Sequence, residues 1–322
     1  MKTFLAADGG GTKLSLILYD ESLRILNTTK AGGTNMLTRS HEMIREELSA
    51  LLRDFFPDDL THLDALDTTN LGAARYLVDL IREKRTIGEI RGHNEGSVPL
   101  SASGVRWGVT AQAGTGSDVF FIQPDAQDMI GGWGSLLGDE GSGYDIGMKT
   151  IRAAIHAYDG RAPKSILPEL LMKHWDLKNL WGMITLLTRD ENRFQTIAAV
   201  TYVTEEAAER GDETALRIFA EAGHDMTVQL LTILKKHGGQ WQGPIVLSGG
   251  AWKGCSRMAD TFVEEVRAVY PEAEIRYPVF EPVVGCVVDR LVQEGMPIDE
   301  TIERLKQPFS AYLFRHKKGN LI

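Results

Sequence analysis

A short pattern that occurs twice constrains the fold of this chain more than any other feature of its sequence. The segment Asp8–Asp20 aligns without gaps with Ala113–Asp125, at an offset of 105 residues. Each copy has the pattern of a strand, a turn of glycine and hydroxyl residues, a second strand and an acidic turn. A repeat at this distance predicts two similar domains, each beginning with a β-hairpin, rather than a solenoid of short repeats. Two unrelated hairpins with the same turn chemistry are the alternative.

Both turns contain the residue types that bind phosphate. Glycine lets backbone N–H groups approach phosphate oxygens closely, and hydroxyl groups add further donors. Because each turn joins two strands, neither is a Walker A loop or a dinucleotide-binding loop, both of which begin a helix. We therefore expect the two turns to hold the phosphates of a nucleotide between them. The expected phosphate-binding residues are Gly9, Gly10, Gly11, Thr12 and Lys13 in the first turn, and Gly114, Thr115, Gly116 and Ser117 in the second.

Only the first copy offers a carboxylate beside its turn. Asp8 of the first copy corresponds to Ala113 of the second. A carboxylate at the end of a strand, next to bound phosphates, can hold Mg²⁺ directly or through water. We therefore expect Asp8 to be the metal-binding residue, whereas Lys13 could equally point into solvent.

Composition excludes several classes of function. The chain has 322 residues and a formal net charge of −9, which argues against a general binder of nucleic acids or of anionic membranes. It contains only two cysteines, Cys255 and Cys286, so a disulfide framework is excluded and a reducing cytoplasm is expected. No apolar stretch approaches the roughly 18 residues that a membrane span needs. The sequence thus predicts a cytoplasmic protein with neither a nucleic-acid nor a membrane partner.

Hydrophobic periodicity predicts an α/β protein. Apolar runs predict strands at Thr3–Ala7, Leu14–Tyr19 and Arg24–Thr28, and an apolar stripe predicts an amphipathic helix at Ser40–Phe56 with Ser40 as its N-cap. Further strands are expected at Val105–Ala113, Asp118–Ile122 and Pro244–Leu247. Further helices are expected at Leu71–Glu83, Ile146–His156, Pro168–Leu177, Asn192–Arg210, Glu213–Lys236, Met258–Tyr270 and Val283–Glu294.

Motifs along nearly the whole chain resemble one known family. The most specific is the block Gly131–Gly147, which contains Gly-Gly-Trp-Gly and Gly-Asp-Glu-Gly-Ser. Together with the two glycine turns and Leu247–Ala251, it resembles the N-acetylglucosamine kinase family, also described as BadF/BadG-type ATPases. That family belongs to the superfamily of actin, sugar kinases and heat-shock chaperone ATPases. The resemblance implies two ribonuclease-H-like (actin-like ATPase) domains with a cleft between them. We expect them at residues 1–112 and 113–295, with 296–322 packing back on the first.

The resemblance also implies an activity. Members of the family phosphorylate a sugar with ATP, so ATP and Mg²⁺ are the expected cofactors, an amino sugar is the expected substrate and a homodimer is the expected assembly. The resemblance does not distinguish between four possible substrates, namely N-acetylglucosamine, glucosamine, N-acetylmannosamine and N-acetylmuramic acid. By their motifs, Gly249, Gly250 and Ala251 resemble the turn that contacts adenosine. The residues that resemble sugar contacts are Asn35, Asn94, Gly131, Gly132 and Asp139. Asn35 could instead be an ordinary turn residue, and Asp139 could cap the following helix.

The chain departs from the family pattern at two places. The catalytic base of these kinases is an aspartate about twenty residues before the second phosphate turn, and here that position is occupied by Glu95. Glutamate can accept the proton of the attacking hydroxyl, but its carboxylate lies about 1 Å further out, and a misplacement of that size can cost about 10²-fold in rate. The second departure is Asp67–Asn70, which replaces a small-residue turn. His93, next to Asn94 and Glu95, is expected to be structural.

Two other functions fit the sequence less well than a sugar kinase with Glu95 as its base. An ATPase that activates a redox enzyme would need cysteines for a shared Fe–S cluster, and Cys255 and Cys286 do not have a cluster spacing. A sugar or nucleotide sensor with little turnover would result if Glu95 and the altered Asp67–Asn70 segment prevent catalysis. The leading interpretation is transfer of phosphate from ATP to the 6-hydroxyl of an amino sugar.

Overall fold

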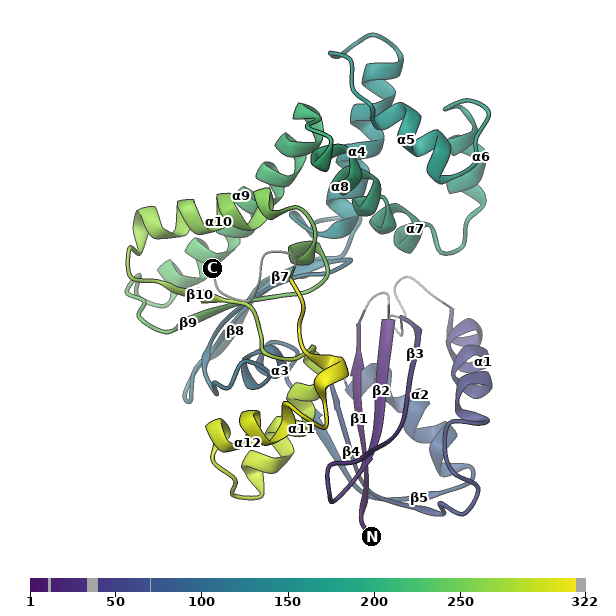
Figure 1. Ribbon diagram of the computed structural model, residues 1–322, viewed down its shortest axis with the longest axis vertical. Coiled ribbons are helices and arrows are strands. Elements are labelled where there is room, and N and C mark those ends of the chain that lie inside the picture. Colours follow the sequence, from purple (N-terminus) through teal and green to yellow (C-terminus); the bar gives the residue numbers. More distant parts are fainter. Residues whose placement is uncertain (11–12, 34–39, 70, 317–322) are drawn as a thin grey trace. The chain divides into compact units, whose positions relative to one another are not determined.

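The computed structural model describes residues 1–10, 13–33, 40–69 and 71–316, and these form two compact units. One unit contains Met1–Gly108 together with Tyr277–Phe314, and the other contains Val109–Arg276. Each has one five-stranded sheet with helices packed on it (Figure 1). The predicted α/β class is therefore confirmed. The division differs from the boundaries that we expected, because residues 277–295 belong to the first unit rather than to the second.

The first sheet combines an antiparallel meander with two parallel strands. Its order is β3-β2-β1-β4-β5, in which β1, β2 and β3 pair antiparallel and β4 runs parallel to both β1 and β5. The carboxyl ends of β1, β4 and β5 therefore lie at the same edge of the sheet. The strands are β1 (Thr3–Gly9), β2 (Lys13–Asp20), β3 (Ile25–Gly32), β4 (His62–Thr69) and β5 (Thr86–His93).

Alternating side chains of β1 bury both faces of this sheet. Phe4 and Ala6 belong to a core that includes residues of α11, whereas Leu5 and Ala7 belong to a core that includes residues of α1 and α2. Ser40 caps α1 as predicted, because its Oγ accepts the backbone N–H of Met43 at 3.2 Å. The helices of this unit are α1 (His41–Leu52), α2 (Leu71–Arg82), α3 (Ser97–Ser101), α11 (Pro282–Gln293) and α12 (Ile298–Leu305), with a short 3₁₀ helix at Ser310–Tyr312.

The second sheet repeats the strand order of the first. Its order is β8-β7-β6-β9-β10, with β9 parallel to both β6 and β10 and with β7 and β8 antiparallel. The repeat in the sequence thus corresponds to a repeated sheet topology. The strands are β6 (Gly108–Ala113), β7 (Ser117–Ile122), β8 (Gln127–Gly131), β9 (Pro244–Ser248) and β10 (Glu274–Arg276).

The second unit carries most of the helices. The long helix α9 contacts β7, β8 and α10. One helix expected at Asn192–Arg210 is two, α7 and α8, which are separated at Val200. The helices are α4 (Gly143–Tyr158), α5 (Leu167–His174), α6 (Gly182–Arg189), α7 (Arg193–Ala199), α8 (Thr201–Glu209), α9 (Glu213–Lys236) and α10 (Ser256–Val269), with a 3₁₀ turn at Ala251–Lys253.

Four strands were not expected from the sequence, namely β4, β5, β8 and β10. The carboxyl end of β4 buries Asp67, Thr68 and Thr69, so polar residues stand where an apolar run would mark a buried strand. β5 lies at the edge of its sheet and is largely exposed, so it lacks a marked apolar pattern. β8 is also an edge strand, and β10 has only three residues.

Gly285 of α11 provides a test of how tightly α11 packs against α3. A Cβ atom at this position would lie 2.1 Å from the backbone carbonyl oxygen of Val98, which a side-chain rotation cannot relieve. We expect Gly285→Ala to lower the free energy of unfolding by about 1–3 kcal/mol, although alanine is favoured over glycine in a helix by about 1 kcal/mol. Urea denaturation measures the change. The exposed Gln293→Ala on the same helix should stay within about 0.5 kcal/mol of wild type, and equal stability of both variants would contradict the packing.

Candidate functional site

The first glycine turn is fixed to the end of β4. The backbone N–H of Gly9 donates to Thr69 Oγ1 at 3.0 Å, and Thr69 Oγ1 donates to Asp8 Oδ1 at 3.1 Å. The backbone N–H of Gly10 donates to the carbonyl oxygen of Lys13 at 2.9 Å, which closes the turn. Burial raises the pKa of Asp8, against the opposing effects of the hydrogen bond from Thr69 and the positive charge of Lys13. An acidic group thus stands beside the turn, with Thr69 setting its orientation.

Glu95 lies in a hydrogen-bonded turn at the carboxyl end of β5. The backbone N–H of Gly96 donates to the side-chain oxygen of Asn94 at 2.8 Å. The backbone carbonyl of Asn94 accepts the N–H groups of Ser97 and Val98, at 3.0 and 3.3 Å, where α3 begins. Glu95 is half-buried. Because β5 is parallel to β4, Glu95 and Asp8 belong to the same edge of the first sheet.

Asp67, the first residue of the altered segment, belongs to a buried ion network. His93 Nε2 lies 3.2 Å from Oδ1 of Asp67, and His93 Nδ1 lies 3.1 Å from Oδ2 of Asp289 on α11. Arg290 donates from Nε to Oδ2 of Asp67 at 2.5 Å, and Ser101 Oγ donates to Oδ1 of Asp289 at 2.5 Å. The side chains of His93, Asp67 and Arg290 are at most 4% exposed. Asp67 therefore serves the packing of α11 on the sheet, and sequence reasoning found neither Asp289 nor Arg290.

The protonation state of His93 follows from these contacts. Burial alone would lower its pKa, but the hydrogen bonds to Asp289 and Asp67 raise the pKa of His93 from the ordinary value of 6.5 to about 9. The imidazole is therefore positively charged at neutral pH. In this state it can donate from both ring nitrogens to the two carboxylates.

In the second unit, Asp139 joins the glycine-rich block to the second glycine turn, Gly114–Ser117, which is called the phosphate turn here because we expect it to bind phosphate. Its carboxylate accepts the backbone N–H of Gly134 at 3.1 Å, the hydroxyl of Ser135 at 3.3 Å and the backbone N–H of Ser117. Burial raises the pKa of Asp139, and these donors oppose that shift. Asp139 does not cap α4, because the N-cap is Ser142, whose side chain accepts the backbone N–H of Asp145.

The backbone around Asp139 is held by a residue that the sequence did not indicate. The carbonyl oxygen of Glu140 accepts both Ser117 Oγ at 2.7 Å and Gln229 Nε2 of α9 at 3.0 Å. The other atom of the Gln229 amide, Oε1, packs so closely on Gly131 that a Cβ there would lie 2.4 Å away. The backbone N–H of Gly132 donates to the carbonyl oxygen of Ser117 at 2.9 Å. Gly131, Gly132, Asp139 and the phosphate turn are thus one connected group.

The third motif of this unit, Gly249–Ala251, packs directly against the same turn. A Cβ atom at Gly249 would lie 2.3 Å from the carbonyl oxygen of Ala113 and 2.9 Å from the backbone nitrogen of Gly114, and its φ is +111°. Only glycine permits both this conformation and this approach. Ala251 begins the 3₁₀ turn that follows, where Trp252 Nε1 donates to Ala111 O at 3.0 Å.

Helix α4 begins on the phosphate turn. The backbone N–H groups of Gly143 and Tyr144 donate to the carbonyl oxygens of Gly114 and Thr115, at 2.7 and 3.2 Å. Free N–H groups at a helix start usually need a partner, and here the turn supplies it. The turn is therefore held from β6, from α4 and from the Gly249 segment.

The structure thus gathers most of the predicted site residues into two groups, one in each unit. Asp8, Gly9, Gly10, Lys13, Asn94 and Glu95 lie at one edge of the first sheet, and Gly114–Ser117, Gly131, Gly132, Asp139 and Gly249–Ala251 lie together in the second unit. Gly11, Thr12 and Asn35, also predicted to bind ligands, fall outside the described residues.

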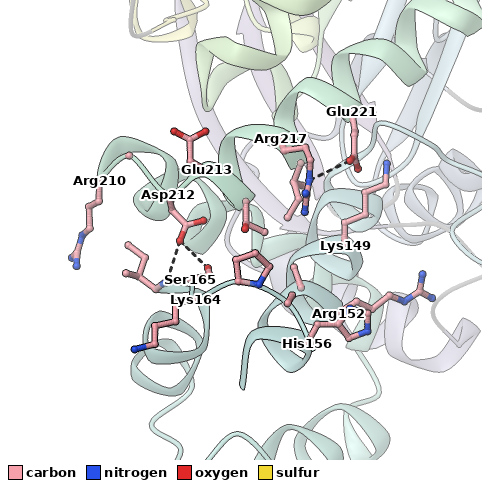
Figure 2. A pocket seen from close by; sticks show the side chains of 17 residues that line it. Lys149, Arg152, His156, Lys164, Ser165, Arg210, Asp212, Glu213, Arg217 and Glu221 are labelled. Carbon is pink, nitrogen blue, oxygen red and sulfur yellow. Dashed lines mark hydrogen bonds and ion pairs between the residues drawn. The ribbon is translucent and has the colours of Figure 1, made fainter. Parts of the chain in front are cut away.

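A hollow of about 910 Å³ in the second unit is separate from these residues (Figure 2). It is lined by α4, residues 162–166 and the beginning of α9, and it contains none of the predicted site residues. Asp212 at its wall caps α9 through the N–H of Ala215 and also accepts Ser165 Oγ at 2.8 Å. Asp212 and Ser165 thus have a structural use, and we do not assign the site to this hollow.

Two searches were confined to the part of the chain that the structure describes. Within residues 1–10, 13–33, 40–69 and 71–316, no group of three or more His, Cys, Asp and Glu side chains could hold a metal ion. In the same ranges, none of the helices combines the length and apolarity that a membrane span requires. Cys286 is a buried thiol.

Comparisons with known proteins were made with both the sequence and the structure. Residues 7–288 match the model of the BadF/BadG/BcrA/BcrD ATPase family, so the predicted family is confirmed. An N-acetylmuramic acid/N-acetylglucosamine kinase from Clostridium acetobutylicum is 27% identical over 89% of this chain and 98% of that protein. An N-acetyl-D-glucosamine kinase from Dictyostelium discoideum is 26% identical over 88% of this chain and 96% of that protein.

Two solved structures extend the comparison to the fold. The crystal structure of a protein from Chromobacterium violaceum has a TM-score of 0.67, with 20% identity over 89% of this chain and 98% of that chain. A ROK family glucokinase from Streptomyces griseus, solved with glucose and AMPPNP, has a TM-score of 0.54, with 15% identity over 91% of this chain and 100% of that chain. These neighbours confirm the predicted actin-like ATPase fold.

The raised pKa of His93 predicts how stability depends on pH. Below about pH 6.5 the imidazole of His93 is charged in both the folded and the unfolded chain, so its ion pairs with Asp67 and Asp289 contribute fully to the free energy of unfolding. This contribution is lost as the pH rises through about 9. The expected loss is about 3 kcal/mol, because one pKa unit corresponds to about 1.4 kcal/mol. Urea denaturation between these two pH values should show the loss in wild type and a flatter profile in His93→Asn. Parallel profiles for the two proteins would contradict the charged network.

Proposed function

The chain belongs to the BadF/BadG/BcrA/BcrD ATPase family, and we propose that it is an ATP-dependent kinase that phosphorylates an amino sugar at the 6-hydroxyl. One observation above all supports this function. In the second unit, the glycine-rich block around Asp139 and the Gly249 segment each contact the phosphate turn, the block through the Asp139 carboxylate and the backbone of Gly132, and the segment through the backbone of Gly249. Residues proposed to bind phosphate, sugar and adenosine are thereby held in one rigid group, as transfer between two bound molecules requires.

The backbone of the first turn and that of the Gly249–Ala251 segment leave room for ATP. At Gly10 and at Gly250 a Cβ atom would meet nothing within 4 Å, so a ligand can approach the backbone there. Asp8 offers a carboxylate beside the first turn, and oxygen ligands of this kind suit Mg²⁺. Gly9–Lys13 and Gly114–Ser117 would hold the phosphates, Asp8 the metal, and Gly249, Gly250 and Ala251 the adenosine. When bound, Mg-ATP supplies the γ-phosphoryl group and neutralises charge on the phosphates.

Glu95 would take the proton from the attacking sugar hydroxyl. In phosphoryl transfer the protein mainly positions the nucleophile and stabilises charge, and a carboxylate that accepts the hydroxyl proton is a recurring part. The hydrogen bonds of Asn94 fix the backbone on both sides of Glu95, so its longer side chain starts from a defined position. Asn94, Gly131, Gly132 and Asp139, with Asn35, would bind the sugar hydroxyls and its nitrogen substituent.

The relatives narrow the substrates to test first. The relative from Clostridium acetobutylicum is named as a kinase of N-acetylmuramic acid and N-acetylglucosamine, and the one from Dictyostelium discoideum as a kinase of N-acetyl-D-glucosamine. A third relative, from Vibrio cholerae, is 22% identical and is named as a glucosamine kinase. We therefore propose an amino sugar of this group rather than a plain hexose. The homodimer stays a prediction.

The direct test is sugar-dependent release of ADP from Mg-ATP with these amino sugars, N-acetylmannosamine and glucose. We expect turnover with at least one amino sugar, and a fall in kcat of about 10²–10⁴-fold in Glu95→Gln because the base is lost. Glu89→Gln is the matched control, since Glu89 is an exposed glutamate on the strand that precedes Glu95. ATP binding without turnover on any sugar would reject the kinase and favour a sensor.

The length of the Glu95 side chain gives a second prediction. Glu95→Asp introduces the aspartate that the family pattern has at this position. It also draws the carboxylate back by about 1 Å, whereas we expect the backbone of this turn to suit the longer glutamate. We expect kcat to fall by about 10²-fold, with little change in the KM for ATP. Steady-state kinetics of this variant beside wild type measure the effect. A kcat equal to or above that of wild type would show that the turn is not fitted to glutamate.

A further inference from the structure

The ion network of the first unit reaches the turn of Glu95 from both of its ends. On the amino-terminal side, His93 is the last residue of β5 and stands two positions before Glu95. On the carboxyl-terminal side, Ser101 is the last residue of α3, the helix that starts two positions after Glu95. Both side chains bind the same carboxylate, Asp289 of α11, one at each oxygen.

From this geometry we infer that Asp289 and His93 are positioning residues for Glu95, holding its turn in place through a shared carboxylate on α11. The inference rests on the proposed function, because Glu95 is the catalytic base only in that function. Asp289 and His93 would touch neither sugar nor nucleotide. They would act by fixing the backbone from which the base reaches the hydroxyl.

The contacts of α3 support this assignment. The helix has only five residues and no side-chain cap, so its own hydrogen bonds hold it weakly. Its beginning is bonded to Asn94 through the N–H groups of Ser97 and Val98, and its end is bonded to Asp289 through Ser101. Val98 also packs on Gly285, one turn of α11 before Asp289. Loss of the Asp289 carboxylate would therefore free the end of α3 and, with it, the turn before it.

The charges around His93 balance only when its imidazole is protonated. Asp67 of β4 and Asp289 of α11 face its two ring nitrogens, and Arg290 of α11 pairs with Asp67. Glu294, the C-cap residue that follows α11, lies at the outside of the network, 3.5 Å from Arg290. Two cations thus face two carboxylates inside the network. A buried network of this kind is costly to leave half-paired, so its members hold one arrangement.

The test compares Asp289→Ala and the milder Ser101→Ala with Glu294→Ala, a matched control that removes a carboxylate from the C-cap of the same helix. We expect kcat to fall by about 10–100-fold in Asp289→Ala and by less in Ser101→Ala, because the base is displaced rather than removed. The KM for ATP should stay within about twofold of wild type in each, since ATP binding is kept. Glu294→Ala should keep wild-type kinetics.

Amide hydrogen exchange supplies a readout that does not depend on catalysis. The N–H groups of Ser97 and Val98, which bond Asn94, should exchange on the order of 10-fold faster in Asp289→Ala and at the wild-type rate in Glu294→Ala. A loss of kcat without faster exchange, faster exchange without a loss of kcat, or equal effects of Glu294→Ala would each overturn the inference. If wild type itself phosphorylates no sugar, the proposed function fails. The exchange rates then decide separately whether Asp289 holds the turn.

Discussion

The positions of the described candidate site residues depend on parallel strand pairing, which occurs in both units. The first strand of each hairpin, β1 or β6, runs beside a parallel strand, β4 or β9. In open α/β sheets ligands bind outside the carboxyl ends of the strands, because parallel pairing brings those ends to one edge. The turn after β1 therefore meets Thr69, and the turn after β6 meets Gly249. Addition of β5, parallel to β4, brings Glu95 to the edge where Asp8 lies.

In the second unit, close approach to the backbone of two glycines helps to fix the site. A Cβ atom at Gly131 would lie 2.4 Å from Oε1 of Gln229, and a Cβ atom at Gly249 would lie 2.3 Å from the carbonyl oxygen of Ala113. Both distances are too short for any residue larger than glycine in this arrangement. In the first unit the corresponding role falls to polar side chains, with Thr69 at the turn of Asp8 and the buried ions around His93 behind Glu95. The two copies of the hairpin thus share a topology but are held by different chemistry.

The parts of the fold that depend on residues close together in the sequence were predicted correctly. The hairpin repeat, the cap at Ser40 and the long helix α9 follow from glycine placement, a capping side chain and an apolar stripe. The strands β4 and β5 were not predicted, because β4 buries polar residues and β5 lies exposed at the edge of its sheet. The buried ion network around His93 could not be predicted, since Asp67 and Arg290 are 223 residues apart in the sequence. No feature of the sequence near Asp67 indicates that Arg290 is its partner.

The central claim is that this chain transfers the γ-phosphoryl group of ATP to the 6-hydroxyl of an amino sugar. The most direct measurement is a ³¹P–¹H correlation spectrum of the product formed from Mg-ATP and the preferred amino sugar. A phosphomonoester whose phosphorus couples to the two protons on carbon 6 is the predicted result. A phosphate ester at the anomeric carbon, or only ADP and free inorganic phosphate with no sugar ester, would contradict the claim.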